Sequence, residues 1–394
     1  MRFTVTAITA ILLFFLPLHT LHAQEAADTT RHTLAGQLLG KGSSERLQVS
    51  LDIRPAFHTS LRPTDDDTEG TFRFDYLTLN LSGRINDRLS YQYTQHLHEG
   101  TKAFAVENLS SSINYACLTY DFHPRWSLTA GKQSFLYGGF EYAESPIDVV
   151  TYSTSNSYLN CYLTGLTLTY RPSPTQEVAV QVVNNRPEGM TDYYGTLPEG
   201  FRRSRLPLFY SVAWNSSCCD DRLQLSYAAS AGEQARGYWA FMVGGGQRLA
   251  FGKVDLYVDV LYQRSSLDHM GALRELYIDP EGVQGASAVR HAEYLTVAGK
   301  LNYRFLPRWN FHAKGFHDRA SVYEATAGQP KGKYLSTWCY EGGLEYFPGR
   351  TQTDLYCFLT VANCLYGNAR KAEAATPDNS TKLYLGFVYR IPVL

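Results

Sequence analysis

From Leu47 onward the chain alternates apolar and polar side chains in segments of about ten residues. A period of two residues is the pattern of a β-strand that presents one apolar and one polar face. In the segment 72–84, for example, Leu77, Leu79 and Leu81 share one face, and hydroxyl and amide side chains occupy the other. The pattern therefore predicts an all-β chain built from amphipathic strands.

The same reading predicts sixteen strands and an alternation of short and long connections between them, with 232–236 as the one short exception among the long ones. The expected strands are 47–58, 72–84, 88–98, 112–122, 126–133, 161–171, 177–184, 208–215, 222–231, 237–250, 253–264, 291–304, 309–317, 338–347, 352–363 and 381–392. An even strand number with short turns at one rim and long loops at the other is typical of outer-membrane barrels. The predicted fold is a 16-stranded antiparallel transmembrane β-barrel with short periplasmic turns and long extracellular loops.

The tryptophans support this fold over a secreted array of β-sandwiches. Trp126 and Trp309 begin strands after short turns, and Trp214 ends a strand before one. Trp239 and Trp338 open strands after loops. Such positions match the two aromatic girdles of a membrane barrel. Closing the sheet also pairs every edge strand, which lipid requires.

The amino-terminal segment predicts export. In the first 23 residues Arg2 is the only charge, an apolar run covers 7–18, and a possible cleavage site follows at 21–23. We therefore expect a signal peptide at 1–23, a short periplasmic segment at 24–46 and an outer-membrane barrel at 47–394. Beyond the signal, the longest apolar run is Tyr238–Val243, far short of the ~20 residues of a membrane-spanning helix.

Composition and charge exclude several classes of function. The 394 residues carry a net charge of −1, which lacks the basic excess expected of a nucleic-acid-binding protein. Charged residues make up only 19% of the chain, and 29 residues are tyrosine, as expected where half of each strand faces lipid. No G-x-S-x-G motif or conspicuous Ser–His pair is present, so we predict no enzymatic activity.

Metal and cofactor sites are also not expected. The seven cysteines show no metal-ligand spacing, and we expect most of them to be unpaired, although disulfides cannot be deduced from sequence. His96 and His98 lie two apart on one strand and precede Glu99, but no third fixed ligand accompanies them. A polar pair facing the lumen is the favoured interpretation.

Sixteen strands enclose a water-filled channel, which predicts passive diffusion of small hydrophilic solutes or ions. If the leucine-rich faces meet lipid, the pore wall receives the charged residues Arg54, Arg84, Asp255, Asp259, Lys300, Arg304, Lys314, Glu341, Glu345 and Arg390. The basic members on 291–304 and 309–317 are flanked by strands with acidic members. This arrangement predicts either a transverse field across the pore or cross-strand ion pairs.

The longest connection, 134–160, is rich in aromatic and apolar residues and is expected to fold inward and constrict the channel. Its charges are Glu141, Glu144 and Asp148, and Lys132 lies just before it. A constriction lined by these residues would disfavour anions.

The stretch WSLTAGKQSFLYGGFEYAESPID at 126–148, followed by YLTGLTLTYRP at 162–172, resembles the phosphate-selective porin O and P family. In that family a strand ending in Gly and a basic residue leads into a constricting loop. The resemblance implies a homotrimeric 16-stranded outer-membrane porin, anion-conducting in the best-known members. Here, however, only Lys132 matches the basic residues of the constriction, so phosphate selectivity is not carried over. The chain also ends Ile391-Pro392-Val393-Leu394 instead of with an aromatic residue.

Two classes of function follow from these observations. The first is a passive solute channel, which conducts ions across a planar bilayer. The second is a structural or interaction barrel that anchors partners at the outer membrane and has a closed lumen.

Overall fold

A computed structural model describes residues 46–61, 69–98, 110–185, 189–279, 282–349, 354–367 and 379–394. The predicted signal peptide at 1–23 and the segment 24–45 lie outside the described residues, so the proposed domain boundaries stay predictions.

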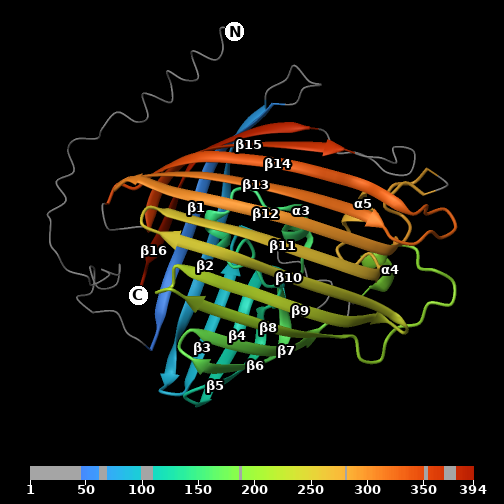
Figure 1. Cartoon of the computed structure of the whole chain (residues 1–394), viewed down its shortest axis with the longest axis horizontal. Coiled ribbons are helices and arrows are strands. Elements are labelled where there is room, and N and C mark those ends of the chain that lie inside the picture. Colours follow the sequence, from blue (N-terminus) through green and yellow to red (C-terminus); the bar gives the residue numbers. More distant parts are fainter. Residues whose placement is uncertain are drawn as a thin grey trace, which may run out of the picture. The chain divides into compact units, whose positions relative to one another are not determined.

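Sixteen antiparallel strands follow one another around a closed barrel, and β1 pairs with β16 to complete the ring (Figure 1). Their bounds are β1 Gln48–Leu61, β2 Glu69–Asn86, β3 Leu89–His96, β4 Ile113–His123, β5 Trp126–Ser134, β6 Tyr162–Ser173, β7 Gln176–Asn184, β8 Leu208–Cys218, β9 Leu223–Ala235, β10 Tyr238–Phe251, β11 Val254–Leu267, β12 Arg290–Leu306, β13 Trp309–Val322, β14 Gly332–Tyr346, β15 Leu355–Gly367 and β16 Ser380–Pro392. The predicted strand number, order and fold class are confirmed.

Several strands are longer than predicted at the end that carries the long loops. β13 continues to Val322 instead of 317, and β14 begins at Gly332 instead of 338. The apolar period marks only the part of a strand whose outer face is apolar, whereas the hydrogen-bonded ladder continues beyond it. Trp338 consequently lies inside β14 and does not open it, which corrects its predicted position.

The two faces of the wall differ as the alternation predicts. Val212, Phe241 and Val260 are about half exposed on the outside, with exposed fractions of 52%, 53% and 45%. On the inner face, Gln181 and Gln263 are buried, which is unusual for glutamine unless other groups cover it. Because these polar side chains of the inner face are buried, other segments of the protein must occupy part of the lumen.

Aromatic pairs mark the strand ends. At the short-turn end Trp126 stacks on Tyr170 with ring centroids 4.4 Å apart, and Trp309 lies 5.0 Å from Tyr346. At the other end Trp239 lies near Phe241. These rings form the expected girdles at the two interfaces.

The described helices are short turns in the long loops: η1 Pro146–Asp148, α3 Thr154–Tyr158, α4 Met190–Tyr194 and α5 Ala272–Leu276. Within the described residues, no helix has the length and apolar character needed to cross a membrane.

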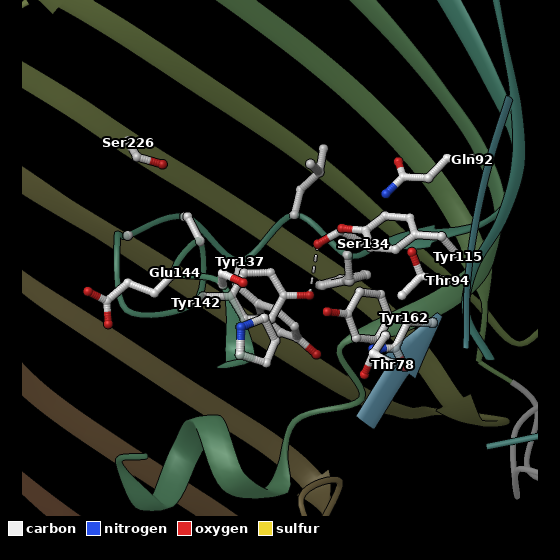
Figure 2. Close-up of a pocket in the computed structure, with 18 of the residues that line it drawn as sticks. Thr78, Gln92, Thr94, Tyr115, Ser134, Tyr137, Tyr142, Glu144, Tyr162 and Ser226 are labelled. Atoms are coloured by element: carbon white, nitrogen blue, oxygen red, sulfur yellow. Dashed lines mark hydrogen bonds between the residues drawn. The ribbon is translucent and has the colours of Figure 1, made fainter. Parts of the chain in front are cut away.

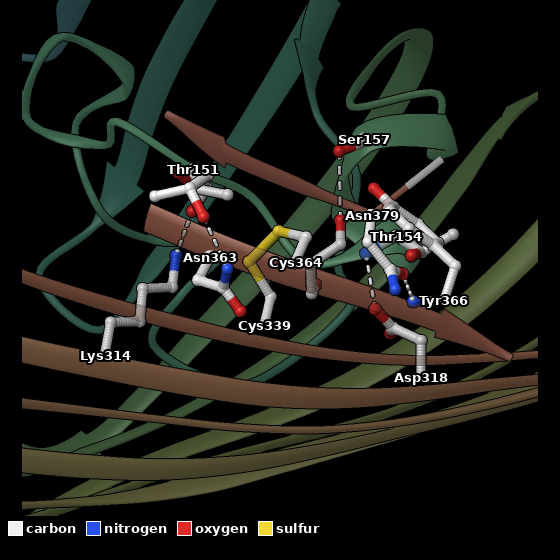
Figure 3. The surroundings of a disulfide bond; sticks show 12 residues. Thr151, Thr154, Ser157, Lys314, Asp318, Cys339, Asn363, Cys364, Tyr366 and Asn379 are labelled. Carbon is white, nitrogen blue, oxygen red and sulfur yellow. Dashed lines mark hydrogen bonds between the residues drawn. A yellow bond between two sulfur atoms is a disulfide. The ribbon is translucent and has the colours of Figure 1, made fainter. Parts of the chain in front are cut away.

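One disulfide joins Cys339 of β14 to Cys364 of β15, which are register partners on the inner face (Figure 3). The other five cysteines are free. The sequence alone does not predict this pair, because the pairing depends on the register of two strands and not on cysteine spacing.

Candidate functional site

The connection between β5 and β6 folds into the barrel, as predicted. We call residues 135–161 the inner loop; it contains η1 and α3. Its first residues, Phe135 and Tyr137, are buried against Val183, Phe209 and Met242 of the wall. Burial of these rings explains why the loop is richer in aromatic residues than a solvated loop would be.

The inner loop approaches the wall so closely at β10 that glycines are required on both sides. Gly138 has a left-handed φ of +74°, and a Cβ added there would lie 2.7 Å from the carbonyl oxygen of Gly244. A Cβ on Gly244 would lie 2.1 Å from the carbonyl oxygen of Tyr137. The alternating pattern does not predict this contact. Its signal was the run Gly244-Gly245-Gly246 in a strand, because glycine in a strand often marks a close backbone approach.

Asp259, predicted as a charge on the pore wall, instead holds the inner loop. Its Oδ2 atom accepts hydrogen bonds from the backbone N–H groups of Phe140 at 2.7 Å and Glu141 at 2.6 Å. Asp259 itself is buried, with an exposed fraction of 8%. A carboxylate held by two backbone donors acts as an attachment point, and its charge is not presented to the channel.

Each of the three predicted loop carboxylates forms an ion pair with a basic residue of the wall. Glu141 Oε1 lies 2.7 Å from Lys314 Nζ, and Glu144 Oε1 lies 2.8 Å from Lys300 Nζ. Asp148 pairs with Arg390. All six are residues that the sequence predicted to lie in the constriction or the pore wall, but it did not predict that they meet in three pairs across residues 141–390 of the chain. The three negative charges of the loop are matched by three positive charges of the wall.

The Glu141–Lys314 pair is the most buried of the three, with both side chains 1% exposed. Burial alone would raise the pKa of Glu141, but the charge of Lys314 and hydrogen bonds from Lys314 and Ser153 outweigh it and lower the pKa. Because the pKa is lowered in the folded state, the stabilisation is present above the ordinary glutamate pKa and is lost only as the pH falls through the lowered value.

Arg54 and Asp318 hold the two helical turns of the inner loop. The Arg54 Nη1 atom donates to the carbonyl oxygens of Ile147 at 2.8 Å and Val149 at 2.7 Å, at the end of η1. Asp318 Oδ2 accepts a hydrogen bond of 2.8 Å from the backbone N–H of Thr154, the first residue of α3. Arg54 was a predicted wall residue, whereas Asp318 was missed because nothing in its sequence neighbourhood distinguishes it.

Three other predicted wall residues have partners outside the inner loop. Arg84 lies 3.7 Å from Asp121, Asp255 pairs with Arg248, and Arg304 lies over the ring of Phe347. Lys132 is buried in β5.

Glu341 and Glu345 flank His312, each at 3.4 Å from one ring nitrogen. The lysines of β12 and β13 thus pair mainly with the inner loop and not with the acidic residues of neighbouring strands. This is a third arrangement, which the two sequence-based hypotheses did not include.

His96, considered as a metal ligand, hydrogen-bonds to Thr78 at 2.9 Å and Asn114 at 2.6 Å. Within the described residues no group of three His, Cys, Asp or Glu side chains could hold a metal ion.

Beside the inner loop remains a cavity of about 460 Å³ (Figure 2). We call it the polar cavity. Residues of β1–β6, β8 and β9 and the first part of the inner loop line it. Its lining includes the tyrosines Tyr76, Tyr115, Tyr137, Tyr142 and Tyr162 and the carboxylates Asp52 and Glu144, but no lysine or arginine among the described residues.

This architecture is that of outer-membrane porins. The chain DcaP of Acinetobacter baumannii, an outer-membrane channel, is similar with a TM-score of 0.59 and 13% identity, over 87% of this chain and 97% of that one. OmpF of Salmonella typhi is similar with a TM-score of 0.57 and 12% identity, over 87% of this chain and 97% of that one. A trimer form of OmpT of Vibrio cholerae is similar with a TM-score of 0.53 and 10% identity, over 88% of this chain and 99% of that one. A search of curated proteins found no significant match.

The model of the phosphate-selective porin O and P family matches residues 51–391, and the chain belongs to this family. It is an outer-membrane porin, a channel for passive diffusion, and its family and fold are those of a channel and not of an enzyme.

The close approach at Gly244 generates a first prediction. Gly244→Ala places a Cβ against the carbonyl oxygen of Tyr137 and displaces the inner loop from β10. We expect a larger single-channel conductance in planar bilayers. The control is Gly315→Ala on β13, where an added Cβ meets no atom closer than 3.8 Å. Equal conductance of both variants and the parent would contradict the assigned contact.

The buried pair generates a second prediction. Glu141→Gln removes the ion-pair partner of the buried Lys314 ammonium and leaves only the more distant carboxylate of its cross-strand neighbour Glu341, at a cost of up to about 3–5 kcal/mol in free energy of unfolding. The double variant Glu141→Gln/Lys314→Met removes both charges and recovers part of that loss. Reversible urea unfolding in lipid measures the free energy of unfolding of the parent, the two single variants and the double variant, which together form a double-mutant cycle. Strictly additive effects of the two changes would show that the pair does not couple the loop to the wall.

Proposed function

We propose that solutes pass through the polar cavity beside the inner loop, and that the channel discriminates only weakly between anions and cations. The observation that carries this proposal is the pairing of Glu141, Glu144 and Asp148 with Lys314, Lys300 and Arg390. Matched charges a few ångströms apart leave little net field at the distances that a passing ion samples. The constriction expected from the loop residues thus carries little net charge of either sign.

The absence of lysine and arginine from the described lining of the polar cavity supports the same proposal and argues against phosphate as the preferred solute. Anion selectivity in a pore requires cationic side chains along the path. Lys300 and Lys314 have side chains that are 9% and 1% exposed, and both are engaged by the inner loop. The family's phosphate selectivity is therefore not part of the proposed function.

The alternative, a structural barrel with a closed lumen, gains some support from the inner loop, which occupies part of the lumen. The polar cavity on the opposite side favours the channel, because its lining is hydrophilic and includes exposed Gln92. Absence of conductance steps in planar bilayers would favour the closed barrel.

We expect Glu144→Gln to shift the reversal potential in a KCl gradient toward the chloride equilibrium potential. Loss of this carboxylate removes one negative charge from the lining of the polar cavity and the ion-pair partner of Lys300. The reciprocal variant Lys300→Gln shifts it toward potassium. Glu177→Gln is the matched control, since Glu177 also forms an ion pair, with Arg171 at 3.0 Å, but lies at the short-turn end. Shifts of the same sign in Glu144→Gln and Lys300→Gln would disprove the charge-matched constriction.

We also propose that the protein assembles as a homotrimer, which the family resemblance implies and the trimer form of the OmpT structure supports by analogy. Light scattering of the detergent-solubilised protein is expected to give three chains per particle after correction for bound detergent. A molar mass of one chain, at concentrations where channels form, would contradict the proposal.

A further inference from the structure

Tyrosine rings face one another across the polar cavity. Tyr115 of β4 and Tyr162 of β6 belong to the wall, and their ring centroids are 5.0 Å apart in an edge-to-face arrangement. Tyr137 and Tyr142 belong to the inner loop and form a second edge-to-face pair at 4.8 Å. Figure 2 shows the two pairs on adjoining sides of the same space. A solute in the cavity is thus close to the Tyr115–Tyr162 pair of the wall and to Tyr142 of the inner loop, whereas Tyr137 is only 3% exposed and offers little accessible ring surface.

Amide and hydroxyl groups stand beside these rings. Gln92 is exposed on β3, and its amide lies next to Tyr115 in Figure 2. Asn80, Asn114, Thr94 and Ser134 complete this part of the lining. These side chains supply both donors and acceptors without carrying charge.

The charged groups of the cavity do not offer a site for an anion. Glu144 is paired with Lys300, and Asp52 accepts a hydrogen bond of 3.0 Å from Asn80. Both are carboxylates, and the described lining includes no cation. An anion entering here would lose part of its hydration and gain no opposite charge, which is unfavourable.

The opposite face of the inner loop repeats this chemistry. A second cavity of about 210 Å³ lies against β13–β16 and is lined by Tyr152, Tyr158, Tyr366 and Tyr384. Lys382 is the only charged residue among its described lining. Rings and hydroxyls therefore flank the loop on both sides, next to the disulfide shown in Figure 3.

We infer that the channel favours neutral polyhydroxylated solutes, that is, saccharides, over inorganic anions. This inference rests on the proposed path through the polar cavity. A saccharide ring has an apolar C–H face that packs on an aromatic ring, and a rim of hydroxyls that exchange hydrogen bonds with amides and hydroxyls. The polar cavity, at about 460 Å³, falls within the ~300–1,000 Å³ range of small-molecule sites. The site holds the saccharide weakly enough to release it, as conduction requires.

The test measures block of the ion current through single channels of the full protein in planar bilayers. The probe is maltotriose, and a polyethylene glycol of the same hydrodynamic size is the comparison because it lacks the ring face and the rim of hydroxyls. We expect maltotriose to reduce the current saturably at concentrations where the polymer only lowers it in proportion to solution conductivity. Inorganic phosphate is expected to give no saturable block.

Variants of the wall pair assign the effect to the polar cavity. Tyr115→Leu/Tyr162→Leu removes both rings and raises the half-blocking concentration of maltotriose about tenfold. Tyr115→Phe/Tyr162→Phe keeps the rings and most of the block. The matched control is Tyr210→Leu, which removes a tyrosine that is 50% exposed on the outside of β8 and leaves the block unchanged.

The possible failures are distinguishable. Normal conductance with equal effects of maltotriose and polymer, or with saturable block by phosphate alone, overturns the saccharide preference and leaves the proposed path standing. Saccharide block that is insensitive to the leucine variant, with native conductance, places the site elsewhere and overturns the inference for this cavity. Absence of conductance in the correctly folded parent overturns both proposals.

Discussion

The whole structure depends on closure of one hydrogen-bonded ladder. In lipid an unpaired backbone N–H or C=O group has no water to bind, so a sheet can cross only if its first and last strands pair. Here β1 and β16 make that pair, from Ser50 opposite Pro392 to Leu61 opposite Thr381. Closure with sixteen strands then leaves an interior too wide for wall side chains alone to fill. A segment that crosses this interior must form contacts of its own, and the inner loop forms them with β1, β7 and β8 as well as with strands of β10–β16.

The inner loop is held by electrostatic complementarity at close range. Its carboxylates meet Lys314, Lys300 and Arg390, its backbone donors meet Asp259 and Asp318, and its carbonyls meet Arg54. Buried charges are costly unless they are paired, and breaking one partner is more costly than never having the pair. The same charges therefore cannot serve both as loop attachments and as a strong field for passing ions. This trade-off makes neutral aromatic and amide groups the chemistry presented to solutes on the opposite side.

The family name refers to phosphate, yet the polar cavity of this chain is lined without lysine or arginine in its described residues. A barrel fixes strand number and diameter, whereas the solute is chosen by the few side chains that remain accessible next to the loop. Members of one porin family can thus share an architecture and differ in the solutes that they favour. In this chain, the difference that we infer rests on which basic residues the inner loop engages.

The sequence by itself determined the strand number, the order of strands and the inward loop, because a two-residue apolar period and the alternation of short and long connections are local properties. It also identified Lys300 and Lys314 as lumen residues, because strand parity assigns a face to each position, and Glu141, Glu144 and Asp148, because they lie in the loop predicted to fold inward. Only the tertiary structure decided that these charges cancel in pairs, that Gly244 admits the loop and that Cys339 meets Cys364. Such contacts join residues distant in sequence, and they depend on strand register and on the path of the loop across the lumen, neither of which a single-strand pattern contains.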